Sequence, residues 1–284
     1  MNKPIATVAR TNEILKKFDL YAKKGYGQNF IVEPGIVRKI AENSKGSDQC
    51  VIEIGPGIGA LTEQLSLIAK HVIAFEIDDR LIDVLAYSLA DYNNIEIIHK
   101  DFLECNFNEV VDELKKQYEK VVVCANLPYY ITTPILFKIF ESKADIDCIT
   151  VMVQKEVADR FCAIKSTKDY NALSVITQYL YNVKTIMKIP RTIFNPKPNI
   201  DSAVVQFTKY TNEYEVENES EFFDFVKGCF KQRRKTLYNN LKELGKDGEF
   251  VKECILACQL NESIRAEACD LKDFVRLYNY WRSL

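Results

Sequence analysis

A short apolar run meets a glycine-rich loop in Val51-Ile52-Glu53-Ile54-Gly55-Pro56-Gly57-Ile58-Gly59-Ala60. The run reads as a strand, and Leu61, Leu65 and Ile68 then recur at helical spacing. Glycine lets the backbone pass close to a ligand, and the start of the following helix offers free N–H groups. The stretch therefore predicts the opening of an α/β unit with a nucleotide-like ligand at its loop.

The same alternation continues along the chain. Further apolar strands are predicted at 72–75, 95–98, 121–125 and 148–153, with helix-like segments between them. This order is typical of a mostly parallel sheet covered by helices on both faces. Two later runs flank a proline-containing loop, and we expect them to pair as an antiparallel hairpin on the sheet edge: 184–189 and 202–207.

The residue pattern changes near residue 211. An acidic segment comes first and is followed by apolar residues at helical spacing, with Gly245 and Gly248 as breaks between the expected helices. We therefore expect a Rossmann-like α/β catalytic domain over residues 1–210 and a small all-helical domain over 211–284.

Composition narrows the class of protein further. The chain has 284 residues, of which 47% are hydrophobic and 27% charged, as in ordinary globular proteins. No apolar stretch approaches the roughly 20 residues of a membrane span, and the amino terminus lacks an apolar signal core, so we expect a cytoplasmic protein that does not enter membranes. The nine cysteines are scattered, odd in number and without a CxxC pair, which indicates reduced core residues and no metal site.

Three acidic and aromatic residues extend the ligand site. Glu76 ends the second strand about twenty residues after the glycine loop, where its carboxylate can accept hydrogen bonds from both hydroxyls of a ribose. Asp101 and Phe102 follow the third strand, where they can meet an adenine edge and ring, although Asp101 also fits an ordinary loop cap. The glycine spacing equally fits the dinucleotide fingerprint, so a nicotinamide dehydrogenase stays open at this point.

The tetrapeptide Asn126-Leu127-Pro128-Tyr129 follows the strand 121–125, at the sheet edge where α/β proteins bind ligands. An adenine N6 amine is a poor nucleophile because its lone pair is delocalised into the ring. The Asn126 side-chain oxygen and the Leu127 carbonyl can hold its two hydrogens so that the lone pair points at a methyl donor. Pro128 stiffens the turn, and Tyr129 offers a face on which an extruded base can stack. The alternative is a plain loop after a strand.

These motifs resemble those of the ribosomal RNA adenine dimethyltransferase family, in its KsgA branch. The likeness covers nearly the whole chain and rests on Gly27–Ile31, Glu53–Gly59, Asn126–Tyr129, Phe194–Pro198 with Asp201–Val205, and Phe230–Leu237 with Asn239–Leu241. The resemblance implies a class I S-adenosylmethionine-dependent methyltransferase fold. It also implies N6,N6-dimethylation of two adjacent adenosines in the 3′-terminal hairpin of 16S (small-subunit) rRNA, with a role in small-subunit biogenesis.

The resemblance also implies a set of site residues. The cofactor S-adenosylmethionine, which leaves as S-adenosylhomocysteine, would be bound by Gln28, Asn29, Ile31, Gly55, Gly57, Glu76, Ile77, Asp101, Phe102 and Asn126. Tyr129 and Phe194 would sandwich the flipped adenine. The partner would be 16S rRNA within an immature small ribosomal subunit, and we expect the chain to act as a monomer.

Basic residues gather in spite of a net charge of −2, which taken alone argues against a nucleic-acid partner. We expect them to contact RNA phosphates: Lys23, Lys24, Lys227, Lys231, Arg233, Arg234 and Lys235. Charged residues clustered as in 227–235 usually form a solvent-exposed helix surface without a ligand. The acidic residues lie in a separate segment that includes Glu213 and Glu215. This separation of opposite charges favours a role of the basic residues in RNA binding.

Three alternatives remain at the level of function. One is the sister enzyme that methylates large-subunit rRNA and confers macrolide resistance. The Arg233-Arg234-Lys235 signature favours the small-subunit branch instead. Another is a ribosome-assembly factor whose binding outweighs its catalysis. The dehydrogenase ranks third because it gives Asn126–Tyr129 no use.

Overall fold

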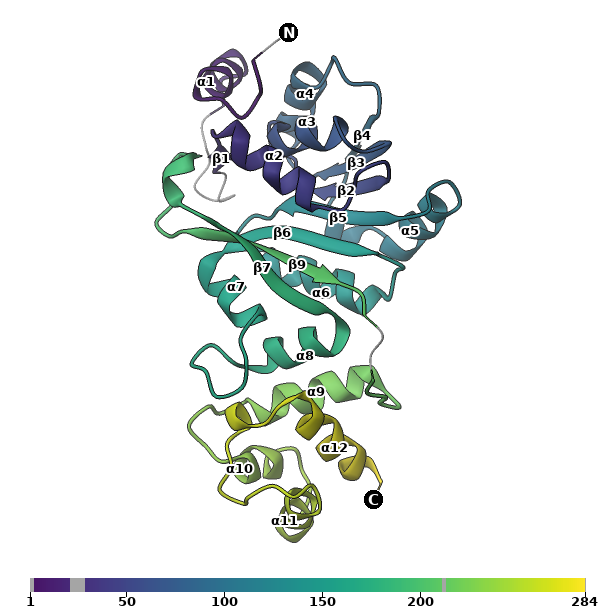
Figure 1. Ribbon diagram of the computed structural model, residues 1–284, viewed down its shortest axis with the longest axis vertical. Coiled ribbons are helices and arrows are strands. Elements are labelled where there is room, and N and C mark those ends of the chain that lie inside the picture. Colours follow the sequence, from purple (N-terminus) through teal and green to yellow (C-terminus); the bar gives the residue numbers. More distant parts are fainter. Residues whose placement is uncertain (1–2, 21–28, 211–212, 284) are drawn as a thin grey trace. The chain divides into compact units, whose positions relative to one another are not determined.

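The structure is a computed structural model, and it describes residues 3–20, 29–210 and 213–283 (Figure 1). Its contacts divide the chain into two compact units. The α/β unit comprises residues 1–158 and 184–209, and the helical unit comprises 159–183 and 210–284. The division differs from the predicted boundary at 210 in one segment, 159–183. That segment carries the helix α8 (Ala172–Leu180), whose Tyr179 ring packs on Phe222 with centroids 5.1 Å apart.

A seven-stranded sheet forms the centre of the α/β unit (Figure 1). Its strands lie in the order β4 (Ile95–His99), β3 (His71–Glu76), β2 (Cys50–Ile54), β5 (Val121–Asn126), β6 (Cys148–Gln154), β9 (Ser202–Thr208) and β7 (Asn182–Ile189). The first five strands are parallel, and β9 pairs antiparallel with β6. The predicted Rossmann-like α/β sheet is confirmed, and the two late runs are neighbouring strands at its edge.

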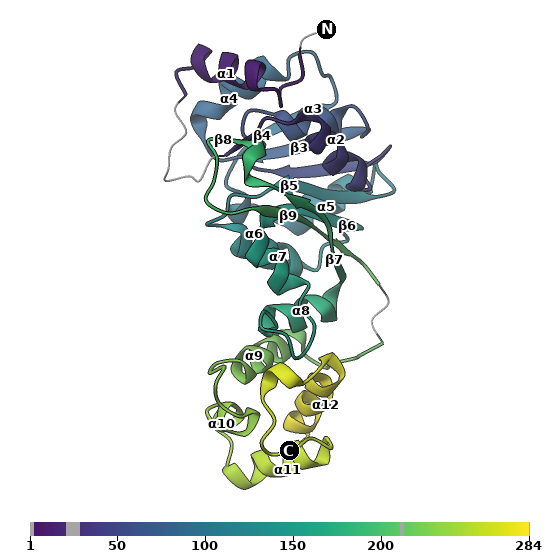
Figure 2. The same ribbon diagram turned by 60° about the vertical axis from the view of Figure 1, so that its left-hand side comes forward.

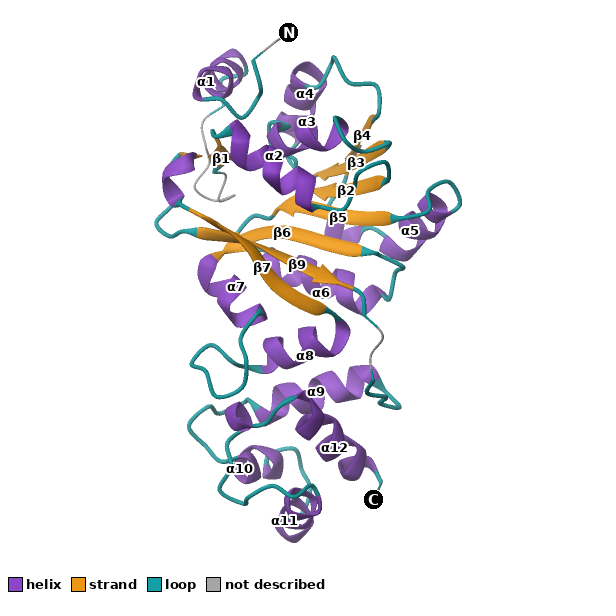
Figure 3. Cartoon of the chain, viewed as in Figure 1, coloured by secondary structure: helices purple, strands orange, loops and turns teal. Residues whose placement is uncertain are grey.

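Helices cover both faces of this sheet, as its apolar strands require. Every residue of β2 is buried, and so are the first five residues of β5. Figures 2 and 3 show α2 and α6 on opposite sides of the strands. The helices of this unit are α1 (Val8–Lys17), α2 (Pro34–Asn43), α3 (Ala60–Ser66), α4 (Asp79–Ser88), α5 (Phe107–Lys115) and α6 (Thr132–Ser142).

A second, two-stranded sheet joins distant parts of the sequence. β1 (Phe30–Ile31) pairs antiparallel with β8 (Phe194–Asn195), so that Ile31 lies opposite Phe194. Short 3₁₀ turns precede α5 and β8, namely η2 (Phe102–Glu104) and η3 (Arg191–Ile193). The segment of Ile31, which the resemblance implies in cofactor binding, is therefore hydrogen-bonded to the segment of Phe194, which it implies in binding the target base.

The helical unit has an aromatic core. Phe222, Phe274 and Tyr278 are fully buried there, and the Phe222 and Tyr278 rings pack edge to face with centroids 5.4 Å apart. The division between the units falls within α7 (Lys155–Phe161). After α8, the helical unit continues with α9 (Glu219–Cys229), α10 (Leu237–Lys242), α11 (Gly248–Ala257), the 3₁₀ turn η4 (Ala266–Ala268) and α12 (Leu271–Arg282). The small carboxyl-terminal helical domain expected from the sequence is present.

Part of the acidic segment that opens the helical domain is itself helical. Glu219, Glu221 and Asp224 lie within α9, and Asn218 caps this helix by accepting a hydrogen bond from the Glu221 N–H. Acidic side chains favour the first turn of a helix because they complement its dipole. Part of the acidic run is therefore explained by helix formation.

All nine cysteines are free thiols, and eight of them are buried, which agrees with their prediction as core residues. Among the residues that the structure describes, no helix has both the length and the apolar composition needed to cross a bilayer.

Candidate active site

The tetrapeptide Asn126–Tyr129 lies where β5 ends, at the carboxyl edge of the parallel strands. Asn126 is the last residue of the strand and stands opposite Met152 of β6. The Leu127 N–H continues the ladder by donating to the Met152 carbonyl at 3.2 Å. The backbone of the motif is therefore fixed by a buried strand rather than by a surface loop.

The turn that follows is closed by further hydrogen bonds. The Pro128 carbonyl accepts from the Ile131 N–H at 3.2 Å and from the Thr132 hydroxyl at 3.0 Å. The Tyr129 hydroxyl lies 2.8 Å from the hydroxyl of Ser202. Within the described part of the chain, no residue hydrogen-bonds the side-chain amide of Asn126. The motif thus has a rigid frame and keeps one polar side chain for a ligand.

The glycine loop takes the conformation that its residues predict. Gly55 and Gly57 have φ angles of 70° and 61°, in the left-handed region that L side chains rarely adopt. The Gly55 N–H donates to the Phe75 carbonyl at 2.9 Å, which ties the loop to the end of β3. Any other residue at these two positions would strain the turn between β2 and α3.

Glu76 at the end of β3 is held by three main-chain N–H groups. One carboxylate oxygen accepts from Gly57 at 3.3 Å, and the other accepts from Ile77 and Asp78, each at 2.9 Å. Burial raises the pKa of Glu76, while these three hydrogen bonds act in the opposite direction. The carboxylate is therefore oriented before any ligand binds.

Glu53 is a site residue that the sequence reasoning missed. Its side chain is 1% exposed, and its Oε2 atom has no hydrogen-bond partner in the described structure. Burial raises the pKa of Glu53 to about 8, the Thr62 hydroxyl lowers it, and the charge of Glu76 raises it further. An acidic residue inside an otherwise apolar strand was the available signal, since buried carboxyls are rare unless they are paired.

Two adjoining cavities surround the glycine loop, and Gly55, Gly57 and Pro128 line both of them. The first is otherwise lined by Asn29, Phe30, Ile31, Glu53, Pro56, Ile58, Ala60, Leu61, Asn126, Leu127 and Tyr129. The second is otherwise lined by Ile54, Phe75, Glu76, Ile77, Asp78, Leu81, Lys100, Asp101, Phe102, Tyr130, Ile131 and Ile135. The first cavity combines apolar walls with Asn29, Glu53 and Asn126, and the second combines apolar walls with the three carboxylates of Glu76, Asp78 and Asp101.

Most predicted cofactor residues come together around these two cavities. Asn29 and Ile31 line the first, and Ile77, Asp101 and Phe102 line the second. Asp101 also caps η2, because its Oδ1 accepts from the Leu103 N–H at 2.8 Å. The ligand role and the cap role of Asp101 are thus compatible. Three predicted site residues lie outside the described residues, namely Gln28, Lys23 and Lys24.

Phe194 is not brought to either cavity. Its ring is 4% exposed and belongs to the hydrophobic core cluster that also holds Ile31, Val37 and Val204. The prediction placed Phe194 against Tyr129 as the second face of a base sandwich. In this structure the Phe194 ring packs into the protein, because β8 pairs with β1 and turns that ring inward.

The basic segment is only partly available for RNA. Lys227 pairs with Asp224 at 3.0 Å, Lys231 with Glu243 at 3.0 Å, and Arg233 with Glu267 at 3.2 Å. All five residues are exposed or nearly so, but across the described ranges only Arg234 and Lys235 of the five have no ion pair. Acids and bases are therefore less segregated in space than in sequence.

The parallel sheet, its glycine loop, the acidic end of β3 and the Asn-Leu-Pro-Tyr turn after β5 together define a class I methyltransferase of the Rossmann-like type. The family model described as "Ribosomal RNA adenine dimethylase" matches residues 20–283. The chain belongs to this family of S-adenosylmethionine-dependent rRNA adenine dimethyltransferases.

Named relatives and solved structures agree with that assignment. The chain is 46% identical to "Ribosomal RNA small subunit methyltransferase A" of Bacillus pumilus, over 98% of each chain. It is 47% identical to the protein of the same name from Enterococcus faecalis, over 98% of this chain and 96% of that one. Among solved structures, a dimethyladenosine transferase from Plasmodium falciparum matches with a TM-score of 0.74 and 26% identity, over 89% of this chain and 97% of the other. The 23S rRNA methyltransferase ErmE matches with a TM-score of 0.67 and 25% identity, over 89% and 99%.

Proposed function

We propose that the chain dimethylates the N6 atoms of two adjacent adenosines in the 3′-terminal hairpin of small-subunit rRNA, within an immature subunit in the cytoplasm. The observation that carries this proposal is the turn Asn126–Tyr129, fixed at the end of β5 and lining a cavity beside the glycine loop. Relatives that are 44–47% identical bear the small-subunit name, which favours this reading over the large-subunit alternative. The dehydrogenase alternative would leave the turn Asn126–Tyr129 without a role.

The two cavities fit S-adenosylmethionine, which supplies an electrophilic methyl group carried on a sulfonium. The first cavity has the unpartnered Glu53 carboxyl oxygen beside Asn29 and Asn126, where the cationic amine of an amino-acid moiety would favour the ionised form of Glu53. In the second cavity, Glu76 would hold the ribose hydroxyls. Asp101 and Phe102 there would meet the adenine, and the exposed Ile77 side chain would cover one face of that ring.

Asn126 and Leu127 would orient the amine of the substrate base. In the first transfer the Asn126 side-chain oxygen and the Leu127 carbonyl would each accept one N6 hydrogen, which favours a tetrahedral nitrogen whose lone pair is withdrawn from the ring π system and points at the methyl group. Placement of this kind contributes roughly 7–11 kcal/mol in well-oriented reactions, so a strong base is not needed. The main-chain bond from Leu127 to Met152 supports this role because it fixes the peptide next to the acceptor.

Tyr129 would provide the stacking face for the extruded adenosine, since its ring lines the first cavity and its hydroxyl is anchored. Phe194 would complete a sandwich only after its ring leaves the core cluster. We therefore propose Tyr129 as the stacking residue of the resting enzyme, and Phe194 as one that joins on RNA binding.

Arg234 and Lys235 are the strongest candidates for phosphate contacts, because the other three basic side chains of the segment already have acidic partners. Phosphate contacts would hold the RNA without reading its sequence. We propose residues 211–284 as the RNA-binding part of the chain on this basis, and residues 1–210 as the catalytic part.

The test is label transfer from S-adenosylmethionine to small and large ribosomal subunits that lack the modification. The proposal predicts label in the RNA of small subunits alone. Label confined to the large subunit would select the alternative reading, and absence of label from both would reject methylation of rRNA.

A further inference from the structure

One hydrogen bond at the candidate active site joins two motifs that are far apart in the sequence. The hydroxyl oxygens of Tyr129 and Ser202 lie 2.8 Å apart. Ser202 is the first residue of β9 and is 1% exposed, whereas the Tyr129 ring is partly exposed and lines the first cavity. Ser202 itself lines neither of the two cavities.

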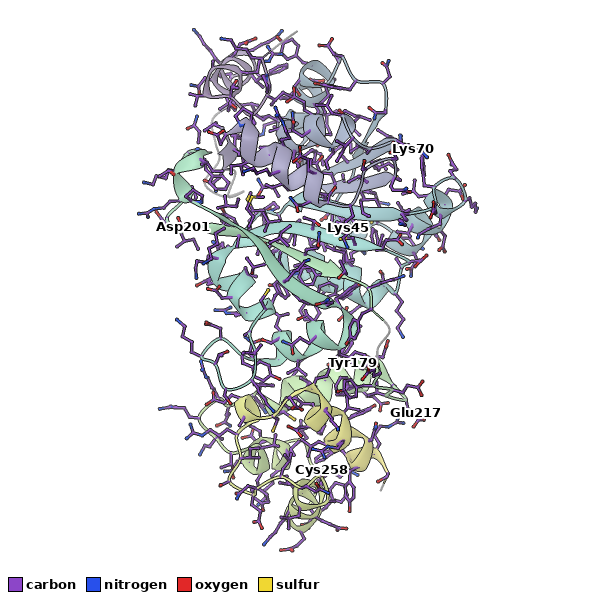
Figure 4. All side chains as sticks on the ribbon, in the orientation of Figure 1. Lys45, Lys70, Tyr179, Asp201, Glu217 and Cys258 are labelled. Carbon is purple, nitrogen blue, oxygen red and sulfur yellow. The ribbon has the colours of Figure 1, made fainter. Side chains whose placement is uncertain are left out.

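The strand register explains why Ser202 is within reach. Asn126 of β5 stands opposite Met152 of β6, and Met152 stands opposite Val204 of β9. Because β9 runs antiparallel, its first residues lie beyond this row, at the edge where the parallel strands end. Ser202 precedes Val204 by two residues, so their side chains point to the same face of the sheet. Figure 4 marks the adjoining Asp201 at that edge.

The start of β9 is itself held in place. The Lys155 N–H donates to the Asp201 carbonyl at 3.0 Å, and the Asp201 carboxylate accepts from the Arg191 N–H at 2.9 Å. The Ser202 hydroxyl is therefore attached to a rigid strand end. A hydrogen bond to such a group restrains its partner more than one to a mobile side chain would.

The contact fixes where the Tyr129 ring lies and restrains its plane. The backbone of Tyr129 follows a turn closed by Pro128, Ile131 and Thr132, and the far end of its ring is tied to Ser202. Anchoring the hydroxyl oxygen stops rotation about the Cα–Cβ bond and so fixes the axis of the ring. Rotation about the Cβ–Cγ bond leaves that oxygen in place, but a phenol O–H prefers the plane of its ring, so the directed hydrogen bond restrains this rotation as well. The plane of a stacked base follows the ring beneath it, and the base plane decides where the N6 lone pair points.

We propose that Ser202 is a positioning residue of the methyl-transfer reaction: its hydroxyl holds the Tyr129 ring in the position at which the target adenosine stacks. The inference rests on the proposed function and deepens it, because it names a residue that acts on the base through Tyr129. Loss of the contact lowers turnover rather than cofactor affinity.

A double-mutant cycle tests this role, with wild type, Ser202→Ala, Tyr129→Phe and the double variant assayed on small subunits that lack the modification. A neutral hydrogen bond of this kind corresponds to roughly a three- to tenfold effect. We expect each single variant to lose roughly that much kcat, and the double variant to lose no more than either single one. The affinity for S-adenosylhomocysteine should be the same in all four proteins.

Two further variants separate positioning from general stability. Ser202→Thr keeps the hydroxyl and should retain most of the activity. Ser66→Ala removes another buried hydroxyl, which bonds the Glu63 carbonyl at 2.8 Å and lines neither cavity, and it should leave kcat unchanged. Thermal unfolding of each variant checks that it is folded under the assay conditions.

The outcomes are distinct. Multiplicative losses in the double variant, or full activity of Ser202→Ala in an assay where the wild type methylates, would overturn the positioning role and leave the proposed function standing. A wild type that transfers no methyl group to either subunit would instead reject the proposed function itself.

Discussion

The sequence singles out both the turn Asn126–Tyr129 and the basic segment Lys227–Lys235, but the two regions differ in how their side chains are held. In the turn, main-chain hydrogen bonds to buried strands and a contact with Ser202 fix each element of the motif. In the basic segment, three of five cationic side chains form ion pairs: Lys227 with Asp224 of the same helix, and Lys231 and Arg233 with acids further along the sequence.

The difference lies in what sets the geometry of each region. A motif at the end of a parallel strand inherits its position from the sheet, so its sequence nearly determines its role. A charged side chain depends on partners that the sequence does not place, such as Glu243 and Glu267. Single substitutions in the turn Asn126–Tyr129 should therefore have large effects on activity, whereas single substitutions in the basic segment should each have small ones.

The largest expected effect comes from Asn126→Ala, which removes an amine-orienting acceptor. Loss of alignment should lower kcat by at least about 100-fold, while cofactor binding stays measurable. Single-turnover methylation of small subunits measures this loss. Asn43→Ala, at an exposed position on α2, is the matched control and should be silent. Equal turnover in both variants would remove the basis for treating the turn as catalytic.

A smaller effect is expected for Glu76→Gln. The amide nitrogen cannot accept a hydrogen bond, so one of the N–H groups of Gly57, Ile77 and Asp78 loses its partner, and so does one ligand hydroxyl. The affinity for S-adenosylhomocysteine should fall about tenfold or more, as measured by calorimetry. Glu42→Gln on the exposed side of α2 is the control. Unchanged affinity would contradict the ribose role of Glu76.

Glu53 should make the stability of the chain depend on pH. Its pKa of about 8 exceeds the ordinary value of 4.5, so the folded chain keeps a proton that the unfolded chain releases between these values. The stabilisation is therefore complete at low pH and is lost as the pH rises through about 8, by up to about 1.4 kcal/mol per pH unit.

Urea unfolding of wild type and Glu53→Gln at several pH values between about 5 and 8 measures this dependence. The variant cannot ionise at this position, so its free energy of unfolding should fall less steeply with pH. Parallel curves would mean that Glu53 titrates normally and is not the buried, unpartnered acid of the first cavity.

The smallest effects are expected in the basic segment, where a matched pair of double variants sharpens the comparison. Arg234→Ala with Lys235→Ala removes two charges without an ion pair, and Lys227→Ala with Lys231→Ala removes two that have acidic partners. The first should weaken RNA binding severalfold and reduce the salt dependence by about two phosphate contacts. The second should change both less. Equal losses would show that the ion pairs do not limit these side chains.

Much of the fold could be predicted because strand periodicity is a local signal. The runs at 51–54, 121–125 and 148–153 are strands of the central sheet, and the glycine loop has the backbone that its residues require. The insertion of β9 between β6 and β7 could not be deduced in detail, since strand order depends on contacts between residues far apart in sequence.

The site was predictable to the same degree. Glu76 and Asn126 follow strands and were found from that position, whereas Glu53 was overlooked because its neighbours Ile52 and Ile54 made it part of a strand. The inward turn of Phe194 depends on β1, and the contact of Ser202 with Tyr129 depends on the antiparallel register of β9. Each of these features is a long-range pairing that no local pattern carries.

We propose that dimethylation of adjacent adenosines of small-subunit rRNA takes place at the turn after β5. Its most direct test is mass spectrometry of nuclease fragments from small subunits incubated with the purified protein and S-adenosylmethionine. We expect two neighbouring N6,N6-dimethyladenosines in the 3′-terminal hairpin with the wild type and none with Asn126→Ala. Methylation at another atom or another site, or products that survive in the Asn126→Ala reaction, would contradict it.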